Sequence, residues 1–219
     1  KFRKDLDAYN VSDHILLFEP DNTDALWIKA EVLRRQDKYA ESRLLLKEIL
    51  KKEPRHNSAL ISLAYIYYND KDFIQAQRLI QRVLESGYIE RENRALANLM
   101  LGAIHSGLAK NGLFLSKLKY GLKIKSYFLK ARQIAPDLPE THLGLGTFYL
   151  VAPAFIGGNL QKAISELENA VAIAPEFATA CARLAQAYKA KKNLTKYNYY
   201  LNKARALDPQ NEVLKEMGS

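Results

Sequence analysis

The chain has 219 residues, of which 48% are hydrophobic and 26% are charged, a balance typical of a folded globular protein and not of a disordered one. Its uncharged apolar runs fall short of the roughly 20 residues that a membrane-spanning helix needs. The net charge is +9, and the single cysteine, Cys181, excludes intrachain disulfides and a zinc site built on several cysteines.

The chain repeats itself with a period of 34 residues. Three sets of positions fall in register: Leu26, Leu60 and Cys181; Ala30, Ala64 and Ala185; and Leu33, Tyr67 and Tyr188. Each unit has the pattern of two apolar-periodic helices of about a dozen residues, joined by a short polar turn. One such hairpin leaves its apolar faces exposed, whereas a stack of several buries them. The pattern predicts an all-α fold, an α-solenoid of antiparallel helix pairs.

This pattern resembles the tetratricopeptide repeat (TPR) family over nearly the whole chain. The matching pieces are Leu63-Ala64 with Tyr67, Leu101-Gly102, Leu145-Gly146 with Tyr149, and Leu184-Ala185 with Tyr188. The resemblance implies a right-handed superhelical stack whose first helices line a concave surface. It also implies a protein that binds other proteins or peptides.

In chain order, residues 1–20 are expected to be the second helix of an incomplete unit, a half-repeat that ends at Pro20. Because the chain begins with Lys1 and not Met, a lipoprotein anchor upstream is compatible with it, and a soluble protein of either the cytoplasm or the periplasm fits. The predicted units of this single superhelical domain are 23–56, 57–90, 95–138, 139–177 and 178–211, followed by a C-terminal cap at 211–219. The third and fourth units carry insertions between their two helices.

Almost all of the net charge lies in residues 93–136, which overlap the third unit. Residues 1–92 carry 16 basic and 16 acidic side chains, residues 93–136 carry 8 basic and none acidic, and residues 137–219 carry 9 basic and 8 acidic. The sequence therefore predicts one locally basic surface.

Within this segment, Lys119, Lys123 and Lys130 share one helical face, which we call the basic ridge. Three interpretations stay open: a long helix buried on two sides with solvated lysines, a docking surface for an acidic partner, or contact with a membrane surface or nucleic acid. Nucleic acid is disfavoured because aromatic residues do not interleave with the lysines. Gly112 and Gly121 are expected to interrupt or bend the helix.

The fourth unit carries a second glycine-containing insertion. Pro153 is expected to end the first helix, and Gly157 and Gly158 to form a tight turn with positive φ. Asn159 is the expected N-cap of the next helix. A glycine pair before a helix can also hold an anion, but no phosphate-binding motif surrounds it, so a structural loop is favoured.

The segment from Ala152 to Ala163 is also similar to two groups of repeat proteins. One is the periplasmic lipoproteins associated with TRAP-type transporters, and the other is the regulator of microtubule dynamics group with its bacterial relatives. The matching residues are Gly157, Gly158, Lys162 and Ala163. The transporter-linked resemblance implies an alternative function, a periplasmic carrier or pore component for a hydrophobic small molecule.

The inward positions of the first helices are predicted to form a partner-binding groove. They are Trp27, Glu31, Arg34, Ile61, Tyr65, Tyr68, Leu99, Met100, Leu143, Thr147, Arg183 and Gln186. The aromatic members suit an extended or helical peptide, but the same stripe is equally compatible with a closed core, or with a groove covered by the N-terminal helix. The TPR carboxylate clamp needs cations where Ile61 and Leu99 stand, so binding of a chaperone C-terminus is not expected.

No convergent catalytic set is visible in the sequence. The four histidines, His14, His56, His105 and His142, lack the paired spacing of a zinc site, and no nucleophile elbow is present. Cys181 stands at a packing position and is expected to be a small buried hydrophobe. We therefore expect no enzyme, no metal and no cofactor, but a scaffold or adaptor for a protein or peptide.

Overall fold

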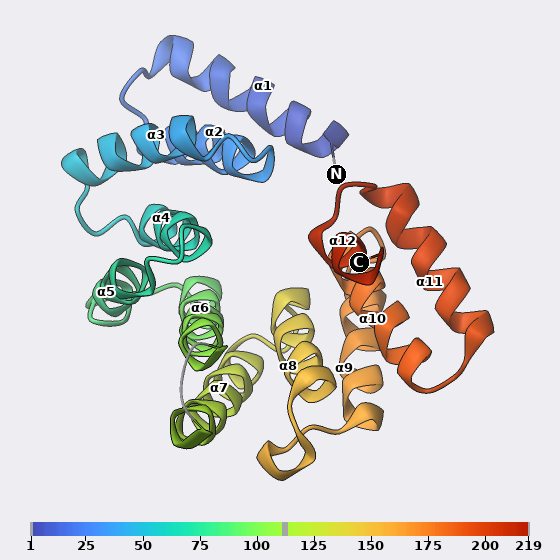
Figure 1. Ribbon diagram of the computed structural model, residues 1–219. Coiled ribbons are helices and arrows are strands. Elements are labelled where there is room, and N and C mark those ends of the chain that lie inside the picture. The colour runs from blue at the N-terminus through green and yellow to red at the C-terminus, as the bar shows by residue number, and fades with distance from the viewer. Residues whose placement is uncertain (1, 111–113, 219) are drawn as a thin grey trace. The chain divides into compact units, whose positions relative to one another are not determined.

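The computed structural model describes residues 2–110 and 114–218 (Figure 1). Its helices are α1 (Phe2–Phe18), α2 (Thr23–Arg35), α3 (Tyr39–Lys52), α4 (Asn57–Asn69), α5 (Phe73–Leu84), α6 (Arg91–Lys110), α7 (Phe114–Ile134), α8 (Pro139–Val151), α9 (Leu160–Ile173), α10 (Ala178–Ala190), α11 (Leu194–Leu207) and α12 (Glu212–Gly218). A short 3-10 turn, η1 (Ala154–Ile156), precedes α9, and the described residues contain no strand. The predicted all-α helical repeat is confirmed. None of the helices in these two ranges is both long enough and apolar enough to span a membrane.

Three helix pairs, α2 with α3, α4 with α5 and α10 with α11, close through the same three-residue turn. Its central residue has a positive φ, 61° at Asp37, 64° at Lys71 and 61° at Lys192. The next residue donates its N–H back to the first helix, as from Lys38 to the Leu33 carbonyl at 3.0 Å. One left-handed residue reverses the chain tightly, so the second helix runs back along the first.

Close packing within each pair depends on small residues. Ala30 is fully buried, and Ser42 Oγ of α3 donates to its carbonyl at 2.8 Å. In α8 the same position is Gly146, where a Cβ would lie only 2.8 Å from Cγ of Leu167 on α9. The close approach inferred from the small residues of the repeat is confirmed at both positions.

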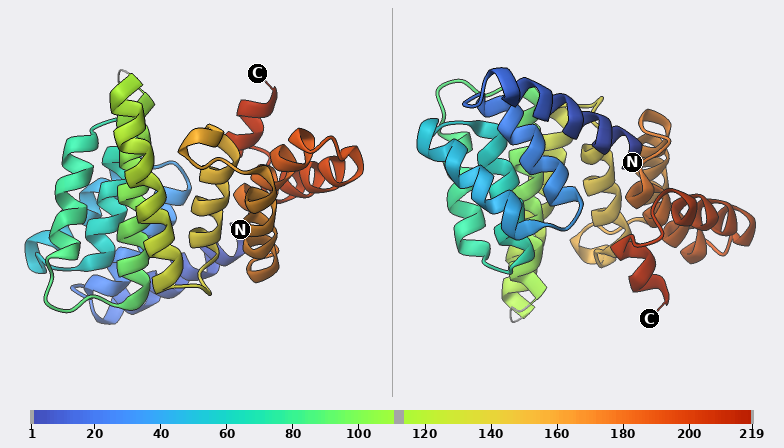
Figure 2. Two further views of the ribbon diagram at one scale, coloured as in Figure 1. Left: turned by 90° about the horizontal axis from the view of Figure 1, so that it is seen from below. Right: turned by 90° about the horizontal axis from the view of Figure 1, so that it is seen from above.

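The helices group into two compact units, residues 1–107 and 108–219. In the first unit α1 packs on α2 (Figures 1 and 2), where Lys29 Nζ lies 2.7 Å from Asp13 Oδ1 and Arg35 Nη1 lies 3.0 Å from Asp5 Oδ1. In the second unit α7 packs against α8, and the C-terminal helix α12 lies against α10 and α11. The boundaries of the individual repeat units stay a prediction.

Helix α7 differs from expectation at two points. Ile124 is buried, but Leu129 is 43% exposed, so this part of the helix is not buried on two sides. Gly121 does not interrupt α7, and the space beside it is filled by Ile156 of η1, whose Cγ2 lies 2.7 Å from where a Cβ would stand. Gly112 lies outside the described residues.

The turn between α8 and α9 agrees with the sequence-based prediction at most of its positions. Helix α8 ends at Val151, two residues before Pro153, and Gly157 has a positive φ of 110°. The φ of Gly158 is not positive, so that part of the prediction is wrong. Asn159 caps α9 as predicted, with its Oδ1 accepting from the N–H of Lys162 at 2.9 Å.

Candidate partner-binding face

The predicted partner-binding residues of the first unit lie on three helices. They are Trp27, Glu31 and Arg34 on α2, Ile61, Tyr65 and Tyr68 on α4, and Leu99 and Met100 on α6. All of them are half-buried. Steps of three and four residues keep side chains on one side of a helix, so α2 and α4 each present three of these residues in a row. We call this set the first-helix face.

Helix α1 contacts α2 at two places around that helix. It contacts Lys29, which pairs with Asp13 and lies with its Nζ 5.1 Å from the centroid of the Tyr9 ring. Lys29 is two residues from both Trp27 and Glu31, about 200° around the helix at about 100° per residue. Asp5 of α1 also binds Arg35, which binds Glu31 Oε1 through Nε at 3.1 Å, so the N-terminal helix lies opposite Trp27 but also reaches the Glu31 end of the first-helix face.

A ladder of polar contacts joins α2 to α4 along the first-helix face. Arg34 binds Glu31 through two nitrogens, with Nε 2.9 Å from Oε2 and Nη2 2.6 Å from Oε1. Ser62 of α4 donates to Glu31 Oε2 at 3.0 Å and accepts from Trp27 Nε1 at 3.1 Å. The guanidinium carbon of Arg34 lies 4.1 Å from the centroid of the Tyr65 ring. These contacts hold the rows of α2 and α4 against each other.

The charges of the ladder compensate one another. The side chains of Glu31 and Arg34 are only 15% and 16% exposed. Burial alone would raise the pKa of Glu31, but the hydrogen bonds and charge of Arg34, with the charge of Arg35, hold that pKa below its ordinary value of 4.5. The carboxylate is therefore ionised at neutral pH, and the Glu31–Arg34 pair presents no net charge to a partner.

Sequence reasoning missed Ser62, although its hydroxyl connects two of the predicted residues. The side chain is buried and stands next to Ile61, one position beyond the 34-residue register of Trp27. A polar side chain at a buried position between two helices is the signal that could have identified it.

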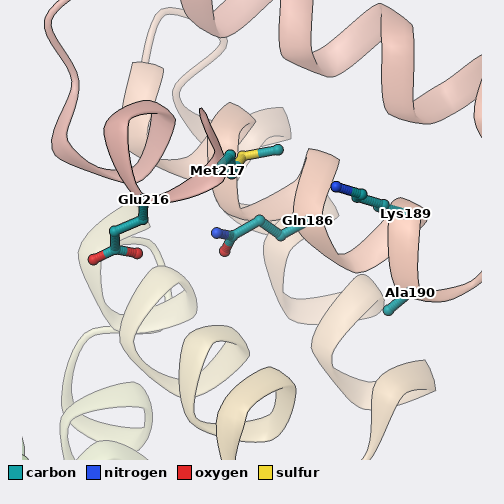
Figure 3. A pocket seen from close by; sticks show the side chains of 5 residues that line it. All are labelled: Gln186, Lys189, Ala190, Glu216 and Met217. Carbon is teal, nitrogen blue, oxygen red and sulfur yellow. The ribbon is translucent and has the colours of Figure 1, made fainter. Parts of the chain in front are cut away.

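In the second unit the predicted residues are Leu143 and Thr147 on α8 and Arg183 and Gln186 on α10. Arg183 Nη1 donates to Gln186 Oε1 at 2.9 Å and to Glu216 Oε2 of α12 at 3.0 Å. An adjacent pocket has a volume of about 400 Å³. It is lined by Gln186, Lys189, Ala190, Glu216 and Met217 (Figure 3). Arg183 is therefore engaged in holding the C-terminal helix against α10.

The basic ridge is described at two of its three members. Lys123 and Lys130 are exposed on α7, and no ion pair among the described residues involves either of them. The side chain of Lys119 lies outside the described residues. The described part of the ridge is therefore a solvated cationic strip beside the exposed Leu129.

His142 and Cys181 are side chains of a type that can act in catalysis, but both are buried within the fold. His142 is buried, with Nδ1 2.7 Å from Glu166 Oε2 and Nε2 2.9 Å from the Pro136 carbonyl. The hydrogen bond to His142 lowers the pKa of Glu166, although burial opposes it. Cys181 is fully buried as predicted, and burial raises the pKa of its thiol. Across the described ranges, no three His, Cys, Asp or Glu side chains come together as a metal site.

No protein-family model matches the chain. The chain is 25% identical over 209 residues to the peroxisomal targeting signal receptor of Komagataella phaffii, a match that covers 85% of this chain and 34% of the receptor. The chain thus spans about a third of the length of the curated relatives that it matches, the second being the receptor of Komagataella pastoris.

Solved structures give the fold. A thermophilic TPR protein of Thermus thermophilus is similar with a TM-score of 0.71 and 20% identity, over 89% of this chain and 96% of that protein. A monomeric IFIT1 mutant in complex with m7Gppp-AAAA is similar with a TM-score of 0.70 and 17% identity, over 98% of this chain and 48% of that protein. The chain has the TPR fold, as its repeat pattern predicts.

Proposed function

We propose that this protein is a non-enzymatic scaffold that binds a peptide or protein segment on the first-helix face of residues 1–107. The observation that carries the proposal is the pairing of half-buried aromatic side chains with charges that already compensate one another. Partly exposed aromatic rings gain free energy when a partner buries them, and they lose little conformational entropy. Trp27, Tyr65 and Tyr68 are the anchors in this proposal.

The chemistry of the face defines the partner. Glu31 and Arg34 satisfy each other, and Ile61 and Leu99 are apolar, so a strongly charged segment would lose hydration without gaining a counter-charge. A largely apolar segment is therefore the expected ligand. The name of the curated relative, a targeting signal receptor, supports peptide recognition as the wider class, over the third of that receptor which the chain spans.

The predicted residues of the second unit are assigned a smaller role. Leu143 and Thr147 are half-buried on α8, where Leu143 packs against the core of the second unit, and Arg183 binds both Gln186 and Glu216 of α12. The alternative of a carrier for a hydrophobic small molecule stays a prediction, because no specific contact favours it.

Affinity capture from a native extract, with paired variants, tests the proposal. Ile61→Glu places a carboxylate in the first-helix face, and Leu44→Glu places the same charge on α3, where Leu44 is 71% exposed. We expect Leu44→Glu to retain the partner of the unmodified protein and Ile61→Glu to lose it by about tenfold or more. Tyr68→Ser is a second variant of the same face. Circular dichroism of every variant shows whether it is folded. Retention by both face variants would contradict the proposal.

A further inference from the structure

The turn between α8 and α9 differs in length and composition from the three short hairpin turns of the α2–α3, α4–α5 and α10–α11 pairs. The hydrogen bond that closes it, from Asn159 to the Tyr149 carbonyl at 2.8 Å, spans ten residues instead of five. The three short turns are polar, with Gln-Asp-Lys at 36–38, Asp-Lys-Asp at 70–72 and Lys-Lys-Asn at 191–193. The long turn has Val-Ala-Pro-Ala-Phe-Ile-Gly-Gly at 151–158. We call residues 151–158 the apolar tip, which projects beyond the ends of α8 and α9 (Figure 1).

The apolar tip exposes its hydrophobic side chains to water. Val151 is 64% exposed and Phe155 is 67% exposed, and Pro153 and Ala154 between them are also exposed. Surface turns ordinarily use polar residues and glycine. A run of exposed apolar residues at a projecting turn is therefore a candidate contact surface.

The tip is built in one conformation. Ile156 packs into the space beside Gly121 of α7, and Gly157 adopts a left-handed φ of 110°. A Cβ on Gly158 would lie 1.8 Å from the carbonyl oxygen of Ala152, so only glycine allows this approach. Three glycines thus fix the tip, and its exposed side chains are ordered before any partner is met.

Four backbone N–H groups of the tip are bonded within the chain. The N–H groups of Ala152, Ile156, Gly157 and Gly158 donate to carbonyls of residues 148–154 at 2.9 to 3.0 Å. Pro153 has no N–H group to satisfy. Transfer into an apolar environment is costly for backbone donors that depend on water, and these donors do not.

Cations stand at the base of the tip. The Nζ of Lys125 lies 3.0 Å from where a Cβ on Gly157 would be. Lys162, in the first turn of α9, is exposed and has its Nζ 5.8 Å from the centroid of the Tyr149 ring. The sequence has no acidic residue between Glu140 and Glu166. The tip therefore has apolar residues at its far end and ammonium groups at its base. In a lipid leaflet the acyl chains lie inside and the phosphates lie at the surface, so the two arrangements match.

We propose that the apolar tip inserts Phe155 and Val151 into the interfacial region of an anionic lipid surface, while Lys125 and Lys162 contact the head groups. Attachment of this kind is peripheral and requires no spanning helix. A protruding tip enters a deformable lipid surface directly, whereas a protein partner would need a pocket shaped to it. The charge complementarity and the four internally bonded N–H groups favour the lipid.

Sedimentation with vesicles tests the proposal. The probes are vesicles of phosphatidylcholine containing phosphatidylserine, and vesicles of phosphatidylcholine alone. We expect binding to the anionic vesicles that falls about tenfold in Phe155→Ser and in Lys125→Glu/Lys162→Glu, and that weakens with added salt. Ile74→Ser, which alters an apolar residue of α5 that is 66% exposed, should bind like the unmodified protein. Ile61→Glu, which alters the first-helix face, should also bind vesicles normally. A result against the proposed peptide-binding face would therefore leave the vesicle test unaffected.

A local readout completes the test. Phe155→Trp places an indole at the tip, and its emission should shift to the blue and be quenched by brominated lipids on anionic vesicles, beyond any change of the Trp27 background. Absence of vesicle binding by the folded protein would overturn the proposal, as would binding that Phe155→Ser leaves unchanged. Retention of an acidic protein through Phe155, without vesicle binding, would reassign the tip to protein recognition and also overturn it.

Discussion

The guanidinium of Arg34 lies 4.1 Å above the ring of Tyr65 while two of its nitrogens bind the carboxylate of Glu31. One side chain thus links α2 to α4 and compensates a half-buried charge. A lysine keeps the charge but loses the two-point contact and the planar stacking. We expect Arg34→Lys to lower the free energy of unfolding by about 1 to 2 kcal/mol. Urea unfolding followed by circular dichroism measures this loss, and Arg78→Lys at an exposed position of α5 should change it by less than about 0.5 kcal/mol.

Glu31 makes the stability of the first unit sensitive to acid. Its folded-state pKa lies below its ordinary value of 4.5, despite burial, because Arg34 and Arg35 bind its carboxylate. A lowered carboxyl pKa contributes stability above pH 4.5, and that contribution is lost as the pH falls through the folded-state pKa. The unfolding free energy should therefore fall more steeply below pH 4.5 in the unmodified protein than in Glu31→Gln. Parallel curves for these two proteins, with exposed Glu41→Gln as reference, would contradict the role of this carboxylate.

The short hairpin turns hold non-glycine residues in a left-handed conformation. Lys192 has φ 61°, whereas its neighbour Lys191 has φ −74°. Glycine removes the steric cost of a left-handed residue but adds conformational entropy to the unfolded chain. Lys192→Gly should raise the unfolding free energy by about 0.5 kcal/mol and Lys191→Gly should lower it by about the same amount. Thermal unfolding of the two variants gives the comparison, and equal effects of one sign would be inconsistent with the described turn.

Glycine at position 158 is required for space. An added Cβ would lie 1.8 Å from the Ala152 carbonyl oxygen, whereas a Cβ on Gly87 would meet nothing within 4 Å. Gly158→Ala should therefore destabilise the fold by about 2 kcal/mol or more, and Gly87→Ala should be neutral or slightly stabilising. Calorimetric melting of both variants decides the matter, since similar melting temperatures would mean that the apolar tip has another backbone conformation.

Local patterns predicted the elements of this protein better than the contacts between them. The period of 34 residues predicted the paired helices and the buried Cys181, and the glycine pair before an apolar run predicted the N-cap Asn159, because each depends on the pattern within one hairpin. The polar contacts of Ser62 depend on the rotation of α4 relative to α2. The sequence period gives the spacing of the repeats but not this rotation. Gly121 was expected to disrupt a helix, but a contact with Ile156, 35 residues later, gives it a packing role.

The members of the candidate face were predicted individually, and their contacts were not. Trp27, Glu31 and Arg34 stand on one side of α2 because of helical spacing alone. That Arg34 turns to Glu31 and Tyr65, and so removes a net charge from the face, follows only from three-dimensional coordinates.

Hydroxyl-radical footprinting of the protein with a captured partner tests the central claim most directly. The first-helix face contains the oxidisable side chains Trp27, Tyr65, Tyr68 and Met100, all half-buried, and Tyr88 outside it is 79% exposed and serves as the internal reference. We expect the partner to slow oxidation of the four face residues by about threefold or more and to leave Tyr88 unchanged. Protection confined to α3 and α5, or unchanged oxidation of the face residues at saturating partner, would contradict the assignment of this face as the binding site.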